Sequence, residues 1–236
     1  MSAMLRIGVT GTDTGVGKTV VSCALLAALR ARGLVARGMK PVETGVTDRA
    51  AGTDAARLRR AAGDTDPWDD VCPVTFAEPL APMVAAERAG RRVDAAALDA
   101  AAARMGAGAD ALIVEGAGGL LVPFTRSLTF AGLATHWGLD LVVVAADRLG
   151  VLNHALLTVR EAERRGLRVR AVVLNALRPA PADVAEATNA PVLRDLLDGV
   201  PLVTAPYLDG VAQEDPARLA AAGRALADLL LATPLS

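Results

Sequence analysis

A glycine- and threonine-rich turn between two apolar segments constrains the fold of this chain more than any other feature. The first segment, residues 5–9, has the composition of a short buried strand. The turn spans residues 11–17, and Lys18 and Thr19 then begin a largely apolar run over residues 20–29. The length and the alanine and leucine content of this run favour a helix. The sequence therefore predicts a strand, a tight turn and a helix in direct succession.

Such a turn is suited to binding a triphosphate through its backbone. Gly15 and Gly17 allow the backbone to approach a ligand and to adopt positive φ, and the free N–H groups at the helix start attract anions. In such loops a lysine like Lys18 reaches the β- and γ-phosphates, and a hydroxyl like that of Thr19 binds Mg²⁺. The strict pattern, G-x-x-x-x-G-K-T, has glycine where this chain has Thr12. The flanking strand and helix nevertheless favour a P-loop over a chance Gly-Lys-Thr sequence.

Short strand-like runs alternate with longer helical runs over the rest of the chain. The expected strands are residues 5–9, 35–42, 111–115, 141–146, 169–174 and 201–203. The expected helices are residues 18–32, 54–62, 82–89, 94–105, 128–136, 152–165, 184–189 and 216–232. Residues 45–52 are expected to form a loop, and residues 64–82, with four prolines, an irregular surface excursion. We therefore expect a single α/β domain of the P-loop NTPase type over residues 1–236, a mainly parallel sheet with helices on both faces.

The composition argues against several other classes of protein. A net charge of −1 gives no basis for general nucleic-acid binding, and no apolar run approaches the roughly 18–20 residues that span a bilayer. The first expected strand starts too early to leave room for a signal peptide. Cys23 and Cys72 lack the spacing of a metal site. We therefore expect a reduced, cytoplasmic protein that binds neither nucleic acid nor membrane.

Lysine is rare enough in this chain to single out two positions. Only two of the 25 Lys and Arg residues are lysines, Lys18 and Lys40. Where a chain otherwise uses arginine, a lysine indicates a need for a compact ammonium group. Lys18 belongs to the predicted P-loop. Lys40 lies near the end of an expected strand and is therefore the second functional candidate, the alternative being an exposed lysine before a loop.

Other strand ends supply polar candidates, because ligands of parallel sheets bind beyond the carboxyl ends of the strands. Thr44 follows the second expected strand. Glu115 ends the third, where an acidic residue beside a P-loop commonly contacts Mg²⁺, and Gly116 and Gly118 after it leave space for phosphate. A tight turn with a solvated glutamate is the alternative at this position.

Residue types alone leave three further positions open. Asp54 is either a site residue or an ordinary helix N-cap. Asn175, at the end of the fifth strand, either recognises the edge of adenine or caps a turn. Gly150 and Leu152 follow the fourth strand, where backbone amides at a helix start suit a carboxylate. His154, beside them, is weak evidence for acid–base catalysis.

These motifs together resemble those of the dethiobiotin synthetase family. The segments that carry the resemblance are residues 11–19 (GTDTGVGKT), 39–42 (MKPV), 53–55 (TDA), 73–82 (PVTFAEPLAP), 114–119 (VEGAGG), 150, 153–154, 175 and 206–207 (PY). They cover most of the chain, and the order of the loop, KPV and VEGAGG is highly specific. The resemblance implies an ATP- and Mg²⁺-dependent ligase of biotin synthesis, which carboxylates 7,8-diaminononanoate with CO₂ and closes the ring through a carbamic-phosphoric anhydride, giving dethiobiotin, ADP and phosphate.

The resemblance also implies a role for each candidate residue. The residues implied to act in catalysis are Lys18, Lys40 and Thr14. Those implied to bind ATP and Mg²⁺ are Gly15, Val16, Gly17, Lys18, Thr19, Val20, Asp54, Glu115, Gly116, Gly118, Asn175, Pro206 and Tyr207, with Thr19, Asp54 and Glu115 as the metal ligands. Those implied to bind the substrate are Thr14, Lys40, Thr44, Gly118, Gly150, Val151, Leu152 and Asn153. Sites of this family lie at a homodimer interface, so the last four residues are expected to act on the partner subunit's substrate.

The chain departs from the family pattern at two positions. Gly15 stands where relatives often carry Glu, which predicts a looser preference for ATP over other triphosphates. Thr44 stands where Ser is common, which keeps the hydroxyl and adds a methyl group.

A partition-type switch ATPase is the alternative function. That class usually has a second lysine early in its loop, where this chain has Asp13, and often ends in a basic membrane-binding helix. Residues 216–236 contain only two basic residues, Arg218 and Arg224. Cobyrinate amidotransferases share the fold but need a glutaminase domain, for which 236 residues leave no room.

Overall fold

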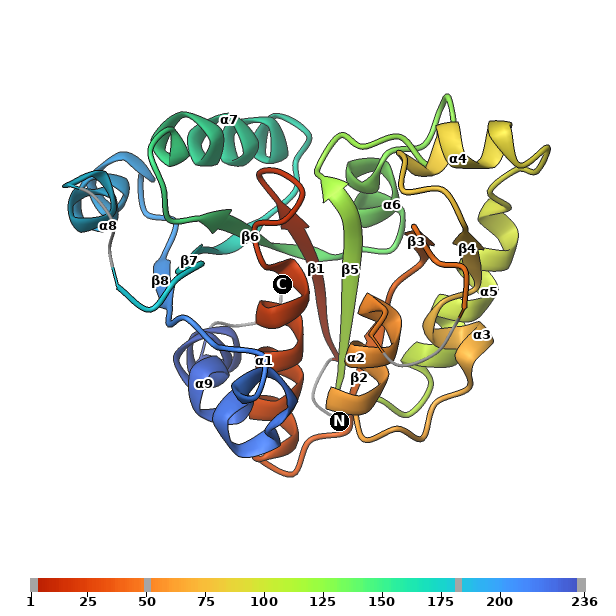
Figure 1. The fold of residues 1–236 in the computed structure, drawn as a ribbon, viewed down its shortest axis with the longest axis horizontal. Coiled ribbons are helices and arrows are strands. Elements are labelled where there is room, and N and C mark those ends of the chain that lie inside the picture. The colour runs from red at the N-terminus through yellow and green to blue at the C-terminus, as the bar shows by residue number, and fades with distance from the viewer. Residues whose placement is uncertain (1–3, 49–51, 181–183, 233–236) are drawn as a thin grey trace.

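A six-stranded sheet lies at the centre of the computed structural model, which describes residues 4–48, 52–180 and 184–232 (Figure 1). In order across the sheet, the strands are β2 (Ala36–Met39), β5 (Ala111–Gly119), β1 (Leu5–Gly11), β6 (Asp140–Ala146), β7 (Val169–Asn175) and β8 (Leu202–Ala205). Every neighbouring pair is parallel. The carboxyl ends of β1, β2 and β5 therefore lie at one edge.

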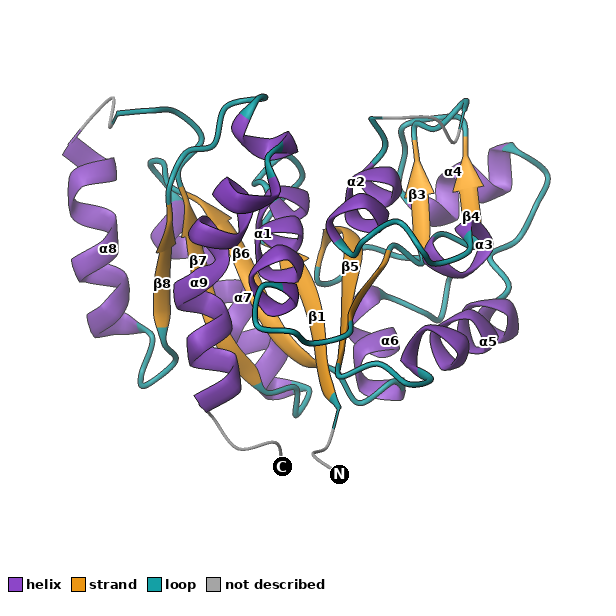
Figure 2. Ribbon diagram, turned by 90° about the horizontal axis from the view of Figure 1, so that it is seen from below, coloured by secondary structure: helices purple, strands orange, loops and turns teal. Residues whose placement is uncertain are grey.

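Helices cover both faces of this sheet. They are α1 (Lys18–Arg30) and α9 (Pro216–Ala232) on one face, and α6 (Phe130–His136) and α7 (Val151–Arg164) on the other (Figures 1 and 2). Ile7 of β1 and Leu25 of α1 belong to one apolar core, and Val143 of β6 and Phe130 of α6 belong to the other. This arrangement confirms the predicted α/β class with a parallel sheet flanked on both faces.

The remaining elements lie around the sheet. They are β3 (Val42–Thr44), α2 (Asp54–Ala61), α3 (Trp68–Val71), β4 (Val74–Phe76), α4 (Pro82–Arg88), α5 (Ala95–Gly106), α8 (Val184–Leu196) and the 3-10 helix η1 (Ala212–Glu214). β3 and β4 pair in parallel as a separate small sheet. None of the helices in the described ranges is both long and apolar enough to cross a membrane.

Three expectations about these elements were wrong. The strand expected over residues 35–42 ends at Met39, because the Lys40 N–H bonds the carbonyl of Val71 (2.7 Å) and Pro41 has no N–H to donate. The excursion expected over residues 64–82 contains α3 and β4, whose runs are too short to produce a clear sequence pattern. The helix expected to end at residue 189 continues through Pro191, because Leu193 is fully buried in the core.

Candidate active site

The P-loop joins β1 to α1, and Gly17 is its most constrained position. Gly15 and Gly17 both adopt left-handed backbone conformations, with φ of 69° and 91°. A Cβ at position 17 would lie 2.1 Å from Nδ2 of Asn175, which donates a hydrogen bond to the carbonyl of Val16 (3.0 Å). The loop is therefore closed against the end of β7, and any residue larger than glycine at position 17 displaces Asn175.

Lys18 folds back across the P-loop. Its Nζ donates a hydrogen bond to the backbone carbonyl of Asp13 (3.1 Å). Burial and the nearby Lys40 ammonium lower the pKa of Lys18 below its ordinary value. The side chain thus holds a buried cation over the turn, where a phosphate group would bind.

Four side chains from four segments converge beside the P-loop: Thr19 of α1, Lys40 after β2, Asp54 of α2, and Glu115 within β5. The Thr19 hydroxyl oxygen lies 2.8 Å from Oδ1 of Asp54 and 2.9 Å from Oε1 of Glu115. Lys40 Nζ lies 2.8 Å from Oδ2 of Asp54 and 2.6 Å from Oε1 of Glu115. Lys40, which stood out because lysine is rare in this chain, therefore forms ion pairs with both Asp54 and Glu115.

Burial and charge act against each other in this cluster. Burial alone would lower the pKa of Lys40, but Glu115 and Asp54 outweigh it and hold the pKa above its ordinary value. Burial alone would raise the pKa of Asp54, but Lys40 holds it below the ordinary value. Each group thus stabilises the charged form of the other, as expected for a buried ion pair.

The same residues fit a divalent metal ion. Oε2 of Glu115 is buried and has no hydrogen-bond partner in the part of the chain that the structure describes. A buried carboxylate oxygen without a partner costs free energy unless a cation or water binds it. Two carboxylates and a hydroxyl are the oxygen ligands that Mg²⁺ prefers, so Thr19, Asp54 and Glu115 match the chemistry of such a site.

Glu43 is a site residue that the sequence reasoning missed. Its carboxylate accepts hydrogen bonds from the backbone N–H groups of Asp54 (2.6 Å) and Ala55 (3.1 Å), and burial raises its pKa. Thr53 caps the same helix through the N–H of Ala56. Glu43 therefore fixes the start of α2, which carries Asp54. An acidic residue directly after the Lys-Pro-Val sequence was the available signal.

The segments predicted to hold adenine meet beside α1. Val20, Asn175 and Pro206 line one narrow, mostly apolar cavity, together with Leu208. Tyr207 does not line this cavity and is 38% exposed. Of the three residues expected around the base, Asn175 and Pro206 therefore share this cavity and Tyr207 does not line it.

A second cavity, of about 480 Å³, opens on the other side of the P-loop. Residues 11–14 and 119–123 line it together with Leu157, Thr158 and Glu161 of α7. The N-terminal residues of α7, 150–153, are not part of this lining. A Cβ added at Gly118 would lie 3.7 Å from the Thr14 methyl group, so these two candidates are neighbours.

Thr44 lies away from the predicted strand tip. It ends β3 in the small sheet, where it pairs with Phe76, rather than following β2. The expectation that Thr44 and Lys40 share one strand tip is therefore wrong, because the strand is interrupted at Lys40 and Pro41, and a new strand begins at Val42.

The fold and the loop first define a class of protein. The sheet, its covering helices and the P-loop are those of P-loop nucleotide-binding proteins, and a ParA family ATPase from Chlorobium tepidum has a similar fold. The two structures align with a TM-score of 0.50 over 98% of this chain and 93% of the other, at 13% sequence identity. This likeness concerns the fold alone.

Sequence comparison then shows the family. A family model described as an AAA domain matches residues 6–204. An ATP-dependent dethiobiotin synthetase from Anaeromyxobacter dehalogenans (strain 2CP-C) is 47% identical over 89% of this chain and 93% of its own length. A second, from Aromatoleum aromaticum, is 40% identical over 91% of this chain and 94% of its own length. The chain belongs to the dethiobiotin synthetase family and is an ATP-dependent enzyme, which confirms the resemblance inferred from its motifs.

Proposed function

We propose that this enzyme converts 7,8-diaminononanoate and CO₂ to dethiobiotin, with ATP and Mg²⁺ as the other requirements. One amine of the substrate takes up CO₂ as a carbamate, and ATP phosphorylates the carbamate oxygen, releasing ADP. The second amine then attacks the carbonyl carbon of the mixed anhydride, closing a cyclic urea and releasing phosphate. Family membership supports the reaction, and the chemistry of the site supports the assignment of its residues.

The observation that carries the assignment is the position of Lys40 between Asp54 and Glu115. Carbamate and triphosphate are both anionic, so bringing them together requires cations more than a nucleophile. Thr19, Asp54 and Glu115 would hold Mg²⁺, which would supply positive charge to the phosphates. With the carboxylates so occupied, Lys40 would be available to bind the carbamate, and Lys18 would contact the γ-phosphate.

We place the substrate in the cavity beside Thr14, with a second copy of this chain completing it. The lining includes Leu157 of α7, whose side chain is 60% exposed, and Leu149 just before that helix is 80% exposed. Exposed leucines around an open cavity are typical of a surface that another subunit covers. The backbone amides of residues 150–153 then bind the carboxylate of the partner's substrate.

We further propose that the enzyme works in the cytoplasm. Cys23 is a free thiol, both cysteines are buried, and burial raises the pKa of the Cys23 thiol to about 12. Thiols kept in this state are in keeping with a reducing compartment.

The test is reconstitution with the purified protein, 7,8-diaminononanoate, bicarbonate, Mg²⁺ and ATP. Dethiobiotin is followed by mass and phosphate by colorimetry, with Lys40→Arg as a parallel sample. We expect product only when all components are present and a loss of about 100-fold or more in the variant, because the bulkier guanidinium cannot occupy the buried site in the same way. Phosphate release without the diamine, and no dethiobiotin with it, would contradict the ligase and favour a switch ATPase.

The same assay tests the nucleotide preference. Gly15 has no side chain with which to contact a nucleotide, and no atom lies within 4 Å of a Cβ added there. We expect CTP or GTP to support turnover within about tenfold of ATP, the range that one lost hydrogen bond accounts for. A much stricter preference for ATP would contradict the expectation.

A further inference from the structure

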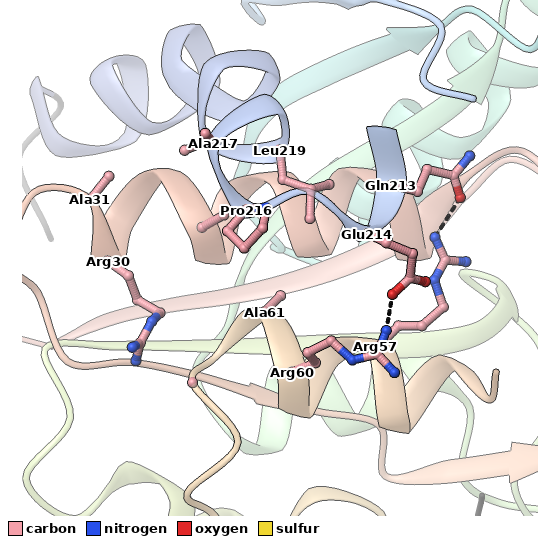
Figure 3. Close-up of a pocket in the computed structure, with 13 residues that line it drawn as sticks. Arg30, Ala31, Arg57, Arg60, Ala61, Gln213, Glu214, Pro216, Ala217 and Leu219 are labelled. Carbon is pink, nitrogen blue, oxygen red and sulfur yellow. Dashed lines mark hydrogen bonds and ion pairs between the residues drawn. The ribbon is translucent and has the colours of Figure 1, made fainter. Parts of the chain in front are cut away.

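A cavity of about 510 Å³ lies between α1, α2 and the start of α9, apart from the site described above (Figure 3). Its floor consists of small and apolar side chains: Ala27, Ala31, Ala61, Pro216, Ala217, Leu219 and Ala220. It shares no lining residue with the adenine cavity or with the cavity beside Thr14. Its volume is within the range of small-molecule sites, about 300–1,000 Å³.

Three arginines and a single carboxylate line this cavity. Arg60 pairs with that carboxylate, Glu214. Arg57 Nη2 instead donates to the neutral amide oxygen of Gln213 (2.6 Å), and Arg30 Nη1 donates to the backbone carbonyl of Ala62 (2.5 Å). Within the described ranges, neither Arg30 nor Arg57 is paired with a carboxylate. The cavity therefore carries a net positive charge.

Arg57 is the cation best placed to exchange its partner. Figure 3 shows its side chain reaching across from α2 to Gln213, whereas Ala61 and Leu219 lie farther along the same cavity. Its hydrogen bond to a neutral amide is weaker than one to a carboxylate would be. Arg30, in contrast, caps the carbonyl of Ala62 at the end of α2, which stabilises the helix and keeps that side chain engaged.

We propose that this cavity binds an aliphatic carboxylate, with the carboxylate on the guanidinium of Arg57 and the alkyl chain over Ala61 and Leu219. The planar fork of arginine matches a carboxylate through two parallel hydrogen bonds. A small inorganic anion would leave the apolar floor exposed to water, whereas an alkyl chain removes it from water. The positive charge and the apolar lining thus favour a ligand that carries both a negative charge and an alkyl chain.

Octanoate is the probe, titrated calorimetrically into the full-length protein, with 1-octanol and acetate as ligands that lack the charge or the chain. We expect one saturable octanoate site per chain, and binding of each partial ligand that is at least about tenfold weaker. Ala61→Leu fills the cavity and leaves every arginine in place. Arg57→Gln removes the charge. Each variant is expected to weaken octanoate binding by about tenfold or more.

Arg218→Gln is the matched control, because Arg218 is an exposed arginine of α9 that does not line the cavity. We expect this variant to bind octanoate like the unsubstituted protein, and thermal unfolding confirms that each variant is folded. If Arg57→Gln fails to fold, Ala61→Leu still decides the result. Octanoate binding that survives in Ala61→Leu places the ligand elsewhere, for instance in the cavity beside Thr14, and overturns the proposal. Absence of saturable binding, equal affinity for 1-octanol, or an equal loss in Arg218→Gln overturns it as well.

Discussion

At the scale of single residues, Lys40 has two roles that depend on the same ammonium group. In the structure it neutralises Asp54 and Glu115, and in the proposed reaction it binds the carbamate. A buried counter-ion that is also needed for chemistry must be able to exchange partners. Mg²⁺ would be a suitable replacement, because carboxylate oxygens are ligands that it prefers.

Lys40→Met tests this exchange through stability rather than turnover. Without the ammonium group, the fully buried Glu115 loses its direct ion-pair partner, so we expect a loss of about 3–5 kcal/mol in the free energy of unfolding. Mg²⁺ should restore more stability in the variant than in the unsubstituted protein, because no lysine competes for the carboxylates. Urea unfolding with and without MgCl₂ measures both effects.

A double variant, Lys40→Met with Glu115→Gln, provides the control. It removes both charges and should be more stable than Lys40→Met alone, and its response to Mg²⁺ should be small. If Lys40→Met alone unfolds like the original protein, or if Mg²⁺ stabilises both equally, Lys40 does not compete with the metal.

Asp54 gives a pH-dependent prediction. Since Lys40 holds its pKa below the ordinary value, Asp54 contributes stability above the unfolded pKa of about 3.9, and this contribution is lost as the pH falls through the lower folded value. Asp54→Asn removes a group that titrates, so we expect a shallower loss of stability between about pH 5 and pH 2. Urea midpoints across this range measure it. Glu163→Gln, at an exposed position of α7, is the control, and an equal change in both variants would refute the assignment to Asp54.

Residue types in the sequence identified most of this cluster, but not its arrangement. The Lys/Arg bias pointed to Lys40, and an expected strand end pointed to Glu115, although β5 in fact continues to Gly119. Asp54 stayed open until the family resemblance was considered. Glu43 was missed because its partners are backbone N–H groups eleven and twelve positions away. No local sequence pattern shows that the start of α2 folds back against Glu43.

At the scale of elements, the P-loop glycines differ in what constrains them. Both positions are left-handed, which costs any other residue about 1–2 kcal/mol. Gly15 has no atom within 4 Å of an added Cβ, whereas Gly17 faces Asn175. The loop therefore tolerates a small side chain at one glycine and not at the other.

Gly17→Ala should be the more disruptive of two matched variants. We expect Gly15→Ala to lose about 1 kcal/mol of stability and Gly17→Ala about 2–4 kcal/mol, since it also displaces Asn175 from its hydrogen bond with Val16. Only Gly17→Ala should weaken ATP binding strongly. Urea unfolding and calorimetric ATP titration measure the two effects. Equal losses in both variants would show that backbone conformation alone constrains the loop.

At the scale of the whole molecule, the class of fold was predictable and the pairing of strands was not. Continuous apolar runs such as residues 141–146, which alternate along the chain with helical runs, indicated a parallel sheet with helices on both faces. The order β2, β5, β1, β6, β7, β8 depends on contacts between distant segments, which local patterns do not encode. The small β3–β4 sheet was missed for the same reason, because its strands have three residues each.

If the proposed dimer forms through the exposed surface of α7, a substitution on that surface should affect both dimerisation and activity. Leu157 lines the cavity beside Thr14 and is 60% exposed, so Leu157→Asp places a charge where the second copy would pack. We expect this variant to be monomeric by light scattering, to stay folded by circular dichroism, and to lose about 100-fold or more in dethiobiotin formation, because the partner's amides no longer reach the substrate.

Leu231→Asp is the control, because Leu231 is 47% exposed and belongs to α9, which lies on the opposite face of the sheet from α7. This variant should change neither the oligomeric state nor the activity. A Leu157→Asp variant that is still dimeric, or a monomer with full activity, would show that the site is complete within one chain.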